Sequence, residues 1–213
     1  MSRSSTVKRA RLLSAAVAVT AAVLAGCSGG GEMAHMPGHE APHNTGQSQA
    51  PGQAAHNQAD VAFAQGMIPH HQQAVEMSRM AADRAGSAEV KQLAEQIQAA
   101  QGPEIEKMTG WLESWGAEVP SGSGMAGMHH GGHDGMVDGM MSPEQMKQLE
   151  QSSGAEFDEA FLSMMIEHHE GAVAMARTEL SDGQFPEAKQ LAQQIIDTQQ
   201  AEIDTMKRLL AQS

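Results

Sequence analysis

Hydrophobic residues recur at spacings of three and four in two consecutive segments, the pattern of amphipathic helices. Gly86-Ser87 separates the segments, because glycine predicts the end of one helix and serine the N-cap of the next. Asp60 is expected to cap the first helix. The two stripes are Phe63, Met67, His70, His71, Ala74 and Met77, and then Leu93, Ile97, Gln101, Glu104, Met108 and Leu112. Together they predict an αα-hairpin over about residues 59–116.

The same pattern returns 98 residues later, over about residues 156–213. Asp60 corresponds to Asp158 and His70 to His168, and the offset is 98 in each case (158 − 60 and 168 − 70). The second arm repeats at the same offset, through Leu191, Ile195, Gln199, Glu202, Met206 and Leu210. An offset that holds through both arms indicates a duplicated unit. Because one hairpin cannot bury its stripe alone, we predict an all-α, antiparallel four-helix bundle with a pseudo-two-fold axis.

Two stretches lack this periodicity and are rich in small and polar residues. Residues 28–58 predict a flexible tether, and residues 117–141 a linker rich in Gly, Met and His. After the linker, Ser142-Pro143-Glu144-Gln145 has the pattern of a capping box with proline at the first helical position, so a short helix should run to Gln151. No segment alternates with a period of two, and no sheet is expected.

The N-terminus has the features of a bacterial lipoprotein signal. A basic start precedes an apolar run from Leu12 to Leu24 that is too short for a comfortable membrane span. The run ends in Leu24-Ala25-Gly26-Cys27, which resembles a lipobox and implies cleavage before Cys27 and acylation of its sulfur. Residues 1–27 would then be a signal peptide, and the mature protein would be anchored to the membrane outside the cytoplasm. The alternative is an ordinary secretory signal with a chance cysteine.

Cysteine and charge exclude several kinds of site. Cys27 is the only cysteine and its sulfur would be acylated, so the mature chain would have no free thiol for a disulfide or a thiolate metal site. The signal carries four of the 13 basic residues and no acidic residue, which leaves 13 − 4 = 9 basic against 26 acidic residues, a net charge of −17. Such a chain is a poor partner for nucleic acid and attracts cations.

The stripes carry metal ligands at helical spacing. His70 and His71 are about 100° apart around the helix and flank one stripe, and residues three or four apart can reach the same ion. Glu104 and Glu202 interrupt apolar stripes, and a buried carboxylate is costly unless it is paired or binds metal. In an antiparallel bundle these polar positions should meet halfway along the helices. The primary candidates are Met67, His70, His71, Glu104, Met164, Met165, His168, His169 and Glu202.

Other residues are weaker candidates with structural alternatives. Gln101 and Gln199 are expected to hydrogen-bond the histidines. Asp60 and Asp158 are expected to be helix caps more than ligands, and Met77 and Met175 to fill the core. Met108 and Met206 could do either. In the linker, His129, His130 and His133 could capture metal.

The donor types favour copper. Thioethers are soft ligands that select copper(I), and imidazole binds copper as well. Zinc is an alternative through His and Glu, but it has little use for methionine. A di-iron bundle needs Glu three residues before each His. Met67 and Met165 occupy those positions before His70 and His168, which argues against iron.

At these motifs the chain resembles the bacterial secreted family known as domain of unknown function 305 (DUF305). The family's Phe-x-x-x-Met-Ile-x-His-His-x-x-Ala-Val-x-Met core matches residues 63–77 and, with one extra Met, residues 161–175. Its Gln-x-x-Glu-Ile-x-x-Met segment matches 101–108 and 199–206. The resemblance covers about residues 59–213 and implies a ferritin-like bundle and copper handling. Pro69 and Gly102-Pro103 interrupt only the first copy, so the two half-sites could differ in shape.

Three functions are compatible with the sequence. The first is a membrane-anchored protein that sequesters copper or hands it on. The second is a metal-dependent oxidase, although no evident nucleophile, cofactor loop or substrate pocket supports an enzyme. The third is a helical module that docks a partner at the cell surface without metal.

Overall fold

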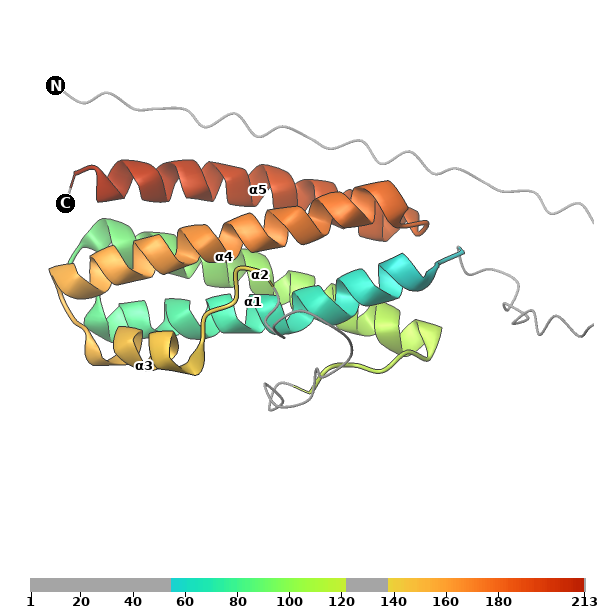
Figure 1. Ribbon diagram of the computed structural model, residues 1–213, viewed down its shortest axis with the longest axis horizontal. Coiled ribbons are helices and arrows are strands. Elements are labelled where there is room, and N and C mark those ends of the chain that lie inside the picture. Colours follow the sequence, from blue (N-terminus) through green and yellow to red (C-terminus); the bar gives the residue numbers. More distant parts are fainter. Residues whose placement is uncertain (1–54, 122–137, 213) are drawn as a thin grey trace, which may run out of the picture. The chain divides into compact units, whose positions relative to one another are not determined.

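The computed structural model describes residues 55–121 and 138–212 (Figure 1). They form five helices: α1 Gln58–Arg84, α2 Ala88–Trp115, α3 Pro143–Gln151, α4 Ala155–Asp182 and α5 Pro186–Leu210. The predicted all-α class is confirmed, because this part of the chain contains only helices and one isolated bridge, between Ala85 and Gly154. The predictions for Cys27, for residues 28–54 of the tether and for His129, His130 and His133 concern residues outside the described ranges. The last residues predicted as tether, 55–58, lead into α1, which begins at Gln58.

Two antiparallel hairpins pack along their first helices. α1 pairs with α2, α4 pairs with α5, and α1 packs against α4, whereas α2 and α5 touch at few points (Figure 1). α1 and α4 run in opposite directions, so the start of each lies beside the turn of the other hairpin. The Gly154 amide donates to the Arg84 carbonyl at 2.8 Å, and the Asn57 side chain donates to the Asp182 carbonyl at 2.8 Å.

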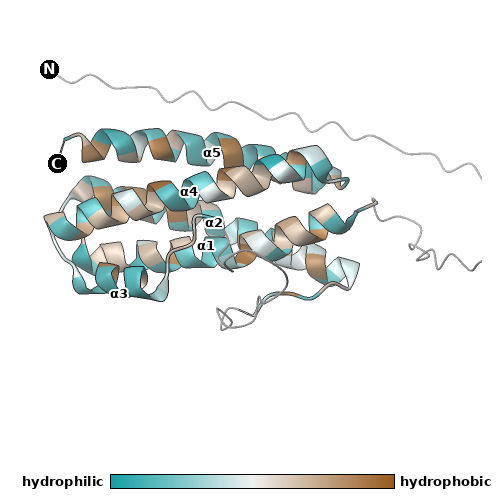
Figure 2. Ribbon diagram, viewed as in Figure 1, coloured by the Kyte–Doolittle hydropathy of each residue, from teal (hydrophilic) through white to brown (hydrophobic). Residues whose placement is uncertain are grey.

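The core divides into two apolar clusters along the helices. One contains Met77, Ile97, Phe157, Met165 and Met206, toward the α1–α2 turn. The other contains Phe63, Met67, Met108, Ala176 and Ile195, toward the α4–α5 turn. Figure 2 shows hydrophobic and hydrophilic residues interspersed along the long helices, as a bundle with one buried face requires. The histidine pairs fall between the two clusters in the sequence of α1 and α4.

The helix ends agree with most sequence signals. Ser87 caps α2 by accepting from the Val90 amide, and the capping box of α3 forms between Ser142 and Gln145. The expectation that Asp60 is the N-cap of α1 is wrong: Asn57 is the N-cap, and Asp60 is the third residue of the helix. A capping box starts one turn before its acidic member, so α1 begins earlier than the hydrophobic stripe indicates.

Both internal prolines are accommodated. α1 continues through Pro69 and α2 through Pro103, although each proline removes one backbone hydrogen bond. None of the helices in residues 55–121 and 138–212 is long and apolar enough to traverse a bilayer.

Candidate metal centre

Four histidines form a buried layer where α1 meets α4. His70 and His71 on α1 and His168 and His169 on α4 have no exposed surface. The rings of His70 and His168 lie against each other, with centroids 3.7 Å apart and planes inclined by 41°. The duplication therefore brings one imidazole from each hairpin together inside the bundle, as the stripes predict.

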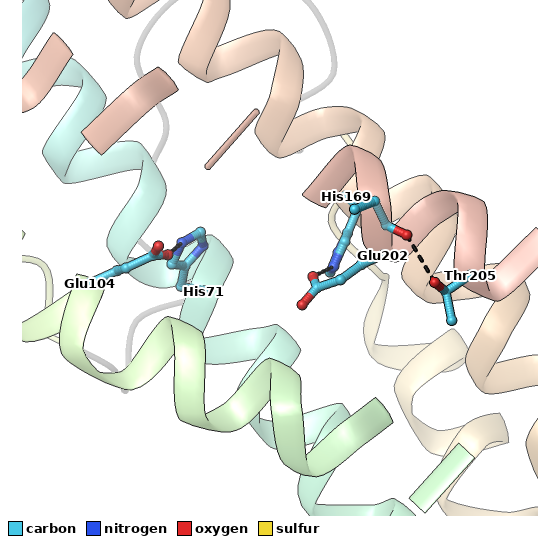
Figure 3. Close-up of polar contacts among 6 residues, drawn as sticks. His71, Glu104, His169, Glu202 and Thr205 are labelled. Atoms are coloured by element: carbon cyan, nitrogen blue, oxygen red, sulfur yellow. Dashed lines mark hydrogen bonds and ion pairs between the residues drawn. The ribbon is translucent and has the colours of Figure 1, made fainter. Parts of the chain in front are cut away.

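The second histidine of each pair is bound by a glutamate of its own hairpin. His71 Nε2 lies 2.8 Å from Glu104 Oε2, and His169 Nε2 lies 2.7 Å from Glu202 Oε2 (Figure 3). The predicted meeting of histidine and glutamate is thus observed in both copies. A carboxylate can only accept, so each Nε2 carries the proton and each Nδ1 of a neutral ring keeps its lone pair. Glu104 and Glu202 retain 18% and 14% of their side-chain exposure, so water reaches them from the side of α2 and α5.

Six ring nitrogens in this layer have no hydrogen-bond partner. They are both nitrogens of His70 and of His168, and Nδ1 of His71 and of His169. The backbone of Asp138 lies close enough to favour the imidazolium form of His70, but no atom there meets hydrogen-bond geometry with the ring. Buried polar atoms are nearly always paired, and leaving one unpaired costs about 1–3 kcal/mol. Six unpaired ring nitrogens in one buried layer need a physical explanation, and a cation bound by their lone pairs would supply one.

The glutamines do not satisfy these histidines. Gln101 and Gln199 are buried, but both polar atoms of each side-chain amide are unpartnered. The expectation that they hydrogen-bond the imidazoles is therefore wrong. The glutamates three residues further along α2 and α5 take that role, because a carboxylate is the stronger acceptor for a ring N–H. The amide oxygens of Gln101 and Gln199 stay available inside the bundle.

Burial favours the neutral form of the His70 and His168 imidazoles. Desolvation, reinforced by His71 and His169, lowers the pKa of His70 to about 3. Desolvation also lowers the pKa of His168 well below its ordinary value, and the neighbouring histidines add to the effect. A neutral imidazole is the form that binds metal, so a cation meets no proton competition from these two rings at neutral pH.

The methionines lie on both sides of the histidine layer. Met67 and Met108 belong to one apolar cluster, and Met77, Met165 and Met206 to the other; all five are fully buried. Met164 and Met175 are partly buried at the edges of these clusters. No group of three or more His, Cys, Asp or Glu side chains in residues 55–121 and 138–212 already has the spacing of a metal site. A site built here would need thioethers or a modest movement of the imidazoles.

Asp60 and Asp158 lie at opposite ends of the bundle, away from the histidines, and cap the turn of the other hairpin. Asp60 Oδ1 accepts from the amides of Gln184 and Phe185 at 3.0 and 2.8 Å. Asp158 accepts from the amides of Gly86 and Ser87 at 3.0 and 2.8 Å. The turn residues are themselves 98 apart, so the contacts are reciprocal. Neither aspartate is the N-cap of its own helix, which is Asn57 for α1 and Gly154 for α4. Their side chains instead join the two hairpins to each other.

The two ends of the bundle differ, because a buried glutamate lies beside only one of the two aspartates. Glu179 is buried beside Asp60, and burial together with the Asp60 carboxyl raises the pKa of Glu179 to about 8. Burial would also raise the pKa of Asp60, but the backbone amides of Asn57, Phe185 and Gln184 that donate to its carboxylate, together with the neighbouring Glu179, lower it overall. A neutral Glu179 can donate to Asp60, which two carboxylates cannot do. In the other copy Ala81 occupies the position of Glu179 (179 − 98 = 81).

The tryptophans complete the end of the bundle near the α4–α5 turn. Trp111 and Trp115 meet the Phe185 ring edge to face, with centroids 5.5 and 5.2 Å away, and Trp115 stacks on His56 at 4.5 Å. Aromatic pairs of this kind contribute packing energy beyond the area that they bury. These aromatic side chains therefore pack together at this end of the bundle.

The chain is similar in sequence and fold to several proteins of known structure. The chain is 34% identical to a DUF305 protein from Streptomyces coelicolor, with a TM-score of 0.64 over 72% of this chain and 93% of that one. It is 37% identical to CopM in a Cu(II)-bound form, with a TM-score of 0.61 over 72% and 96%. It is 30% identical to a DUF305 fragment from Deinococcus radiodurans, with a TM-score of 0.64 over 74% and 98%. CopM is also similar in its Cu(I)-bound, silver-bound and apo forms. No curated protein matches the chain significantly.

A family model covers nearly the whole bundle. It matches residues 60–210, which include all four helical histidines and both glutamates that bind them. The duplicated motifs thus lie inside the matched region. The chain belongs to the family described as a domain of unknown function, DUF305, which confirms the resemblance expected from its motifs.

Proposed function

We propose that this protein binds copper outside the cytoplasm and either sequesters it or hands it on. The carrying observation is the layer of buried imidazoles, six of whose ring nitrogens lack a partner. His70 and His168 would bind the ion, with His71 and His169 contributing through Nδ1. Glu104 and Glu202 would fix the tautomers of those two rings from behind, an arrangement common around metal-bound histidines.

The soft donors favour copper(I) over zinc. Met67 and Met165 each lie three residues from the stacked histidine of the same helix, within one helical turn. Thioethers select copper(I), while calcium and magnesium require oxygen cages. Structures of the relative CopM with Cu(II), Cu(I) and silver support the same class of ion for this chain.

The proposed location is the outer face of a membrane. The lipobox-like Leu24-Ala25-Gly26-Cys27 supports acylation of Cys27, and the following residues would tether the bundle to the lipid. A net charge of −17 for the mature chain would attract cations to its surface. The His- and Met-containing tether and linker would then capture ions for the bundle.

Silver(I) titration of the full-length protein against a competing chelator tests the proposal, because silver(I) is a stable substitute for copper(I). The test variant is His70→Gln with His168→Gln. The matched control is His129→Gln with His130→Gln, which changes the same number of imidazoles in the linker. We expect the test variant to lose about a hundredfold or more in affinity at the tightest site, and the control to lose far less.

Circular dichroism establishes that both variants remain helical. Equal silver affinity in the wild type and in the folded test variant would refute the proposal. A parallel zinc titration separates the metals, since zinc binding stronger than silver(I) binding at these histidines would contradict the assignment to a soft ion.

A further inference from the structure

The last residues of the linker, Asp138–Met141, cross α4 in backbone-to-backbone contact. A Cβ atom on Gly171 would lie 2.1 Å from the Asp138 carbonyl oxygen. A Cβ atom on Gly139 would lie 2.7 Å from the Glu167 carbonyl oxygen, and Gly139 also has a φ of +84°, which favours glycine. Both glycines are therefore needed for Asp138–Met141, hereafter the strap, to lie this close to the helix.

A buried glutamine fastens the strap to α1. Gln73 Nε2 donates to the Met141 carbonyl at 2.9 Å, and the Met141 amide donates to Gln73 Oε1 at 2.7 Å. Gln73 and Met141 are both buried. The side-chain amide thus pairs with the Met141 backbone as a neighbouring strand would. The strap spans from α4 to α1 and is held on both helices.

The two attachment points are the same position of the duplicated unit, since 171 − 73 = 98. In the first copy this position is Gln73, which makes two hydrogen bonds to Met141. In the second copy it is Gly171, whose missing side chain leaves room for the backbone of Asp138. A connection that only closed the core through Met141 would need neither feature. Receiving the strap is therefore a property of both helices at one level of the bundle.

That level lies one helical turn from the stacked histidines. Gln73 follows His70 by three residues, and Gly171 follows His168 by three, so each shares a helix face with its histidine. The Asp138 backbone lies beside His70, and a Cβ atom on Gly139 would be 3.1 Å from the carbonyl of His168. The strap therefore covers the α1–α4 groove directly over the His70–His168 pair.

We propose that the strap controls access of metal ions to His70 and His168, and that Gln73 is the positioning residue that holds it closed. This inference rests on the proposed function. The competing route runs between α2 and α5, past Glu104 and Glu202, which are partly exposed. The closed strap makes the α1–α4 route slow until the two bonds of Gln73 break.

The test variant is Gln73→Leu, which removes both hydrogen bonds at nearly constant volume. The matched control is Gln98→Leu on α2, a partly buried glutamine that bonds only its own helix. A second variant, Gly171→Ala, displaces the strap by a different mechanism. The first measurement uses metal-free full-length protein and follows modification of His70 and His168 by diethyl pyrocarbonate, mapped by peptide mass spectrometry.

We expect diethyl pyrocarbonate to modify these histidines about tenfold faster in Gln73→Leu than in wild type, as the loss of two hydrogen bonds predicts. Gly171→Ala keeps Gln73 and should accelerate the modification by a similar factor, because its methyl group displaces the strap. Gln98→Leu should behave as wild type. Stopped-flow binding of silver(I) should accelerate by a similar factor in the two strap variants. The equilibrium affinity should change little, because opening speeds release as well as entry.

If His70 and His168 are modified at the wild-type rate in folded strap variants, the strap does not shield them. If modification is faster but silver(I) binds at the wild-type rate, the strap does not control access of the ion. Silver(I) would then enter past Glu104 and Glu202. If silver does not bind the histidines of the wild type at all, the proposed function fails and the gating of an ion fails with it. The modification rates, measured without metal, would still decide whether the strap covers the pair.

Discussion

The two copies of the duplicated unit agree at the histidines and differ where they meet the rest of the chain. The His71–Glu104 and His169–Glu202 distances are 2.8 and 2.7 Å, and the stacked pair takes one ring from each copy. By contrast, Gln73 of the first copy corresponds to Gly171 of the second, and Ala81 corresponds to Glu179. The first set fixes the proposed chemistry twice. The second set makes one side of the bundle a covered entrance and one end sensitive to pH.

Substitution of Asp60 or Asp158, which join the two copies, should have the largest effect on stability. Asp60→Ala should lower the free energy of unfolding by about 3 kcal/mol, because it leaves the backbone amides of Asn57, Gln184 and Phe185 without their acceptor. Asp158→Ala removes two such bonds and should cost about 2 kcal/mol. Urea denaturation of the metal-free protein measures both. A loss below about 0.5 kcal/mol in both variants would mean that these contacts do not join the hairpins.

The glutamates test whether the two half-sites are equivalent. Glu104→Gln and Glu202→Gln should each weaken silver(I) binding by about tenfold to a hundredfold, since each removes the carboxylate that orients a histidine. The two losses should agree within about threefold, because the two pairs have the same geometry. Competition titration gives both values. A loss confined to one variant would show that the prolines of the first copy make the half-sites unequal.

The buried acid predicts a pH dependence with a defined sign. The pKa of Glu179 is raised from its ordinary 4.5 to about 8, so the native protein keeps a proton that the unfolded chain releases in this interval. The contribution of this group to stability is complete below pH 4.5 and is lost as pH rises toward 8. Glu179→Gln, which keeps a donor toward Asp60, should be close to wild type at pH 5 and exceed it at pH 9, gaining up to about 1.4 kcal/mol for each pH unit between the two pKa values.

Urea denaturation at the two pH values measures this effect. Ala81→Ser, at the equivalent position of the other copy, is the matched control and should leave the pH dependence as it is in wild type. If the stability of Glu179→Gln falls with rising pH as steeply as that of wild type, a group other than Glu179 causes the loss of stability.

The sequence predicted the repeated parts of the molecule well. Hydrophobic periodicity and the offset of 98 residues lead to the hairpins, and antiparallel helices place Glu104 near His71 by height alone. Contacts across the duplication were harder to predict. Nothing local to Asp60 or Asp158 indicates that each caps the other hairpin's turn, since that depends on how α1 and α4 pack.

Two signals in the sequence were present but ambiguous. Gly139 and Gly171 could have indicated a close approach of two backbones, but isolated glycines are also common in linkers and helices. Gln101 and Gln199 have the right height to bond the histidines, yet the glutamates do so instead. Which of two polar neighbours reaches a ring depends on helix rotation by a few tens of degrees. Periodicity does not fix a rotation of that size.

The central claim is that soft metal ions bind at the buried histidine layer. Anomalous diffraction from crystals of the full-length protein grown with silver(I) tests it directly. We expect a strong silver peak between α1 and α4, within bonding distance of ring nitrogens of His70 and His168. Silver peaks confined to the tether, the linker or the outer surface, with the histidine layer metal-free, would contradict it.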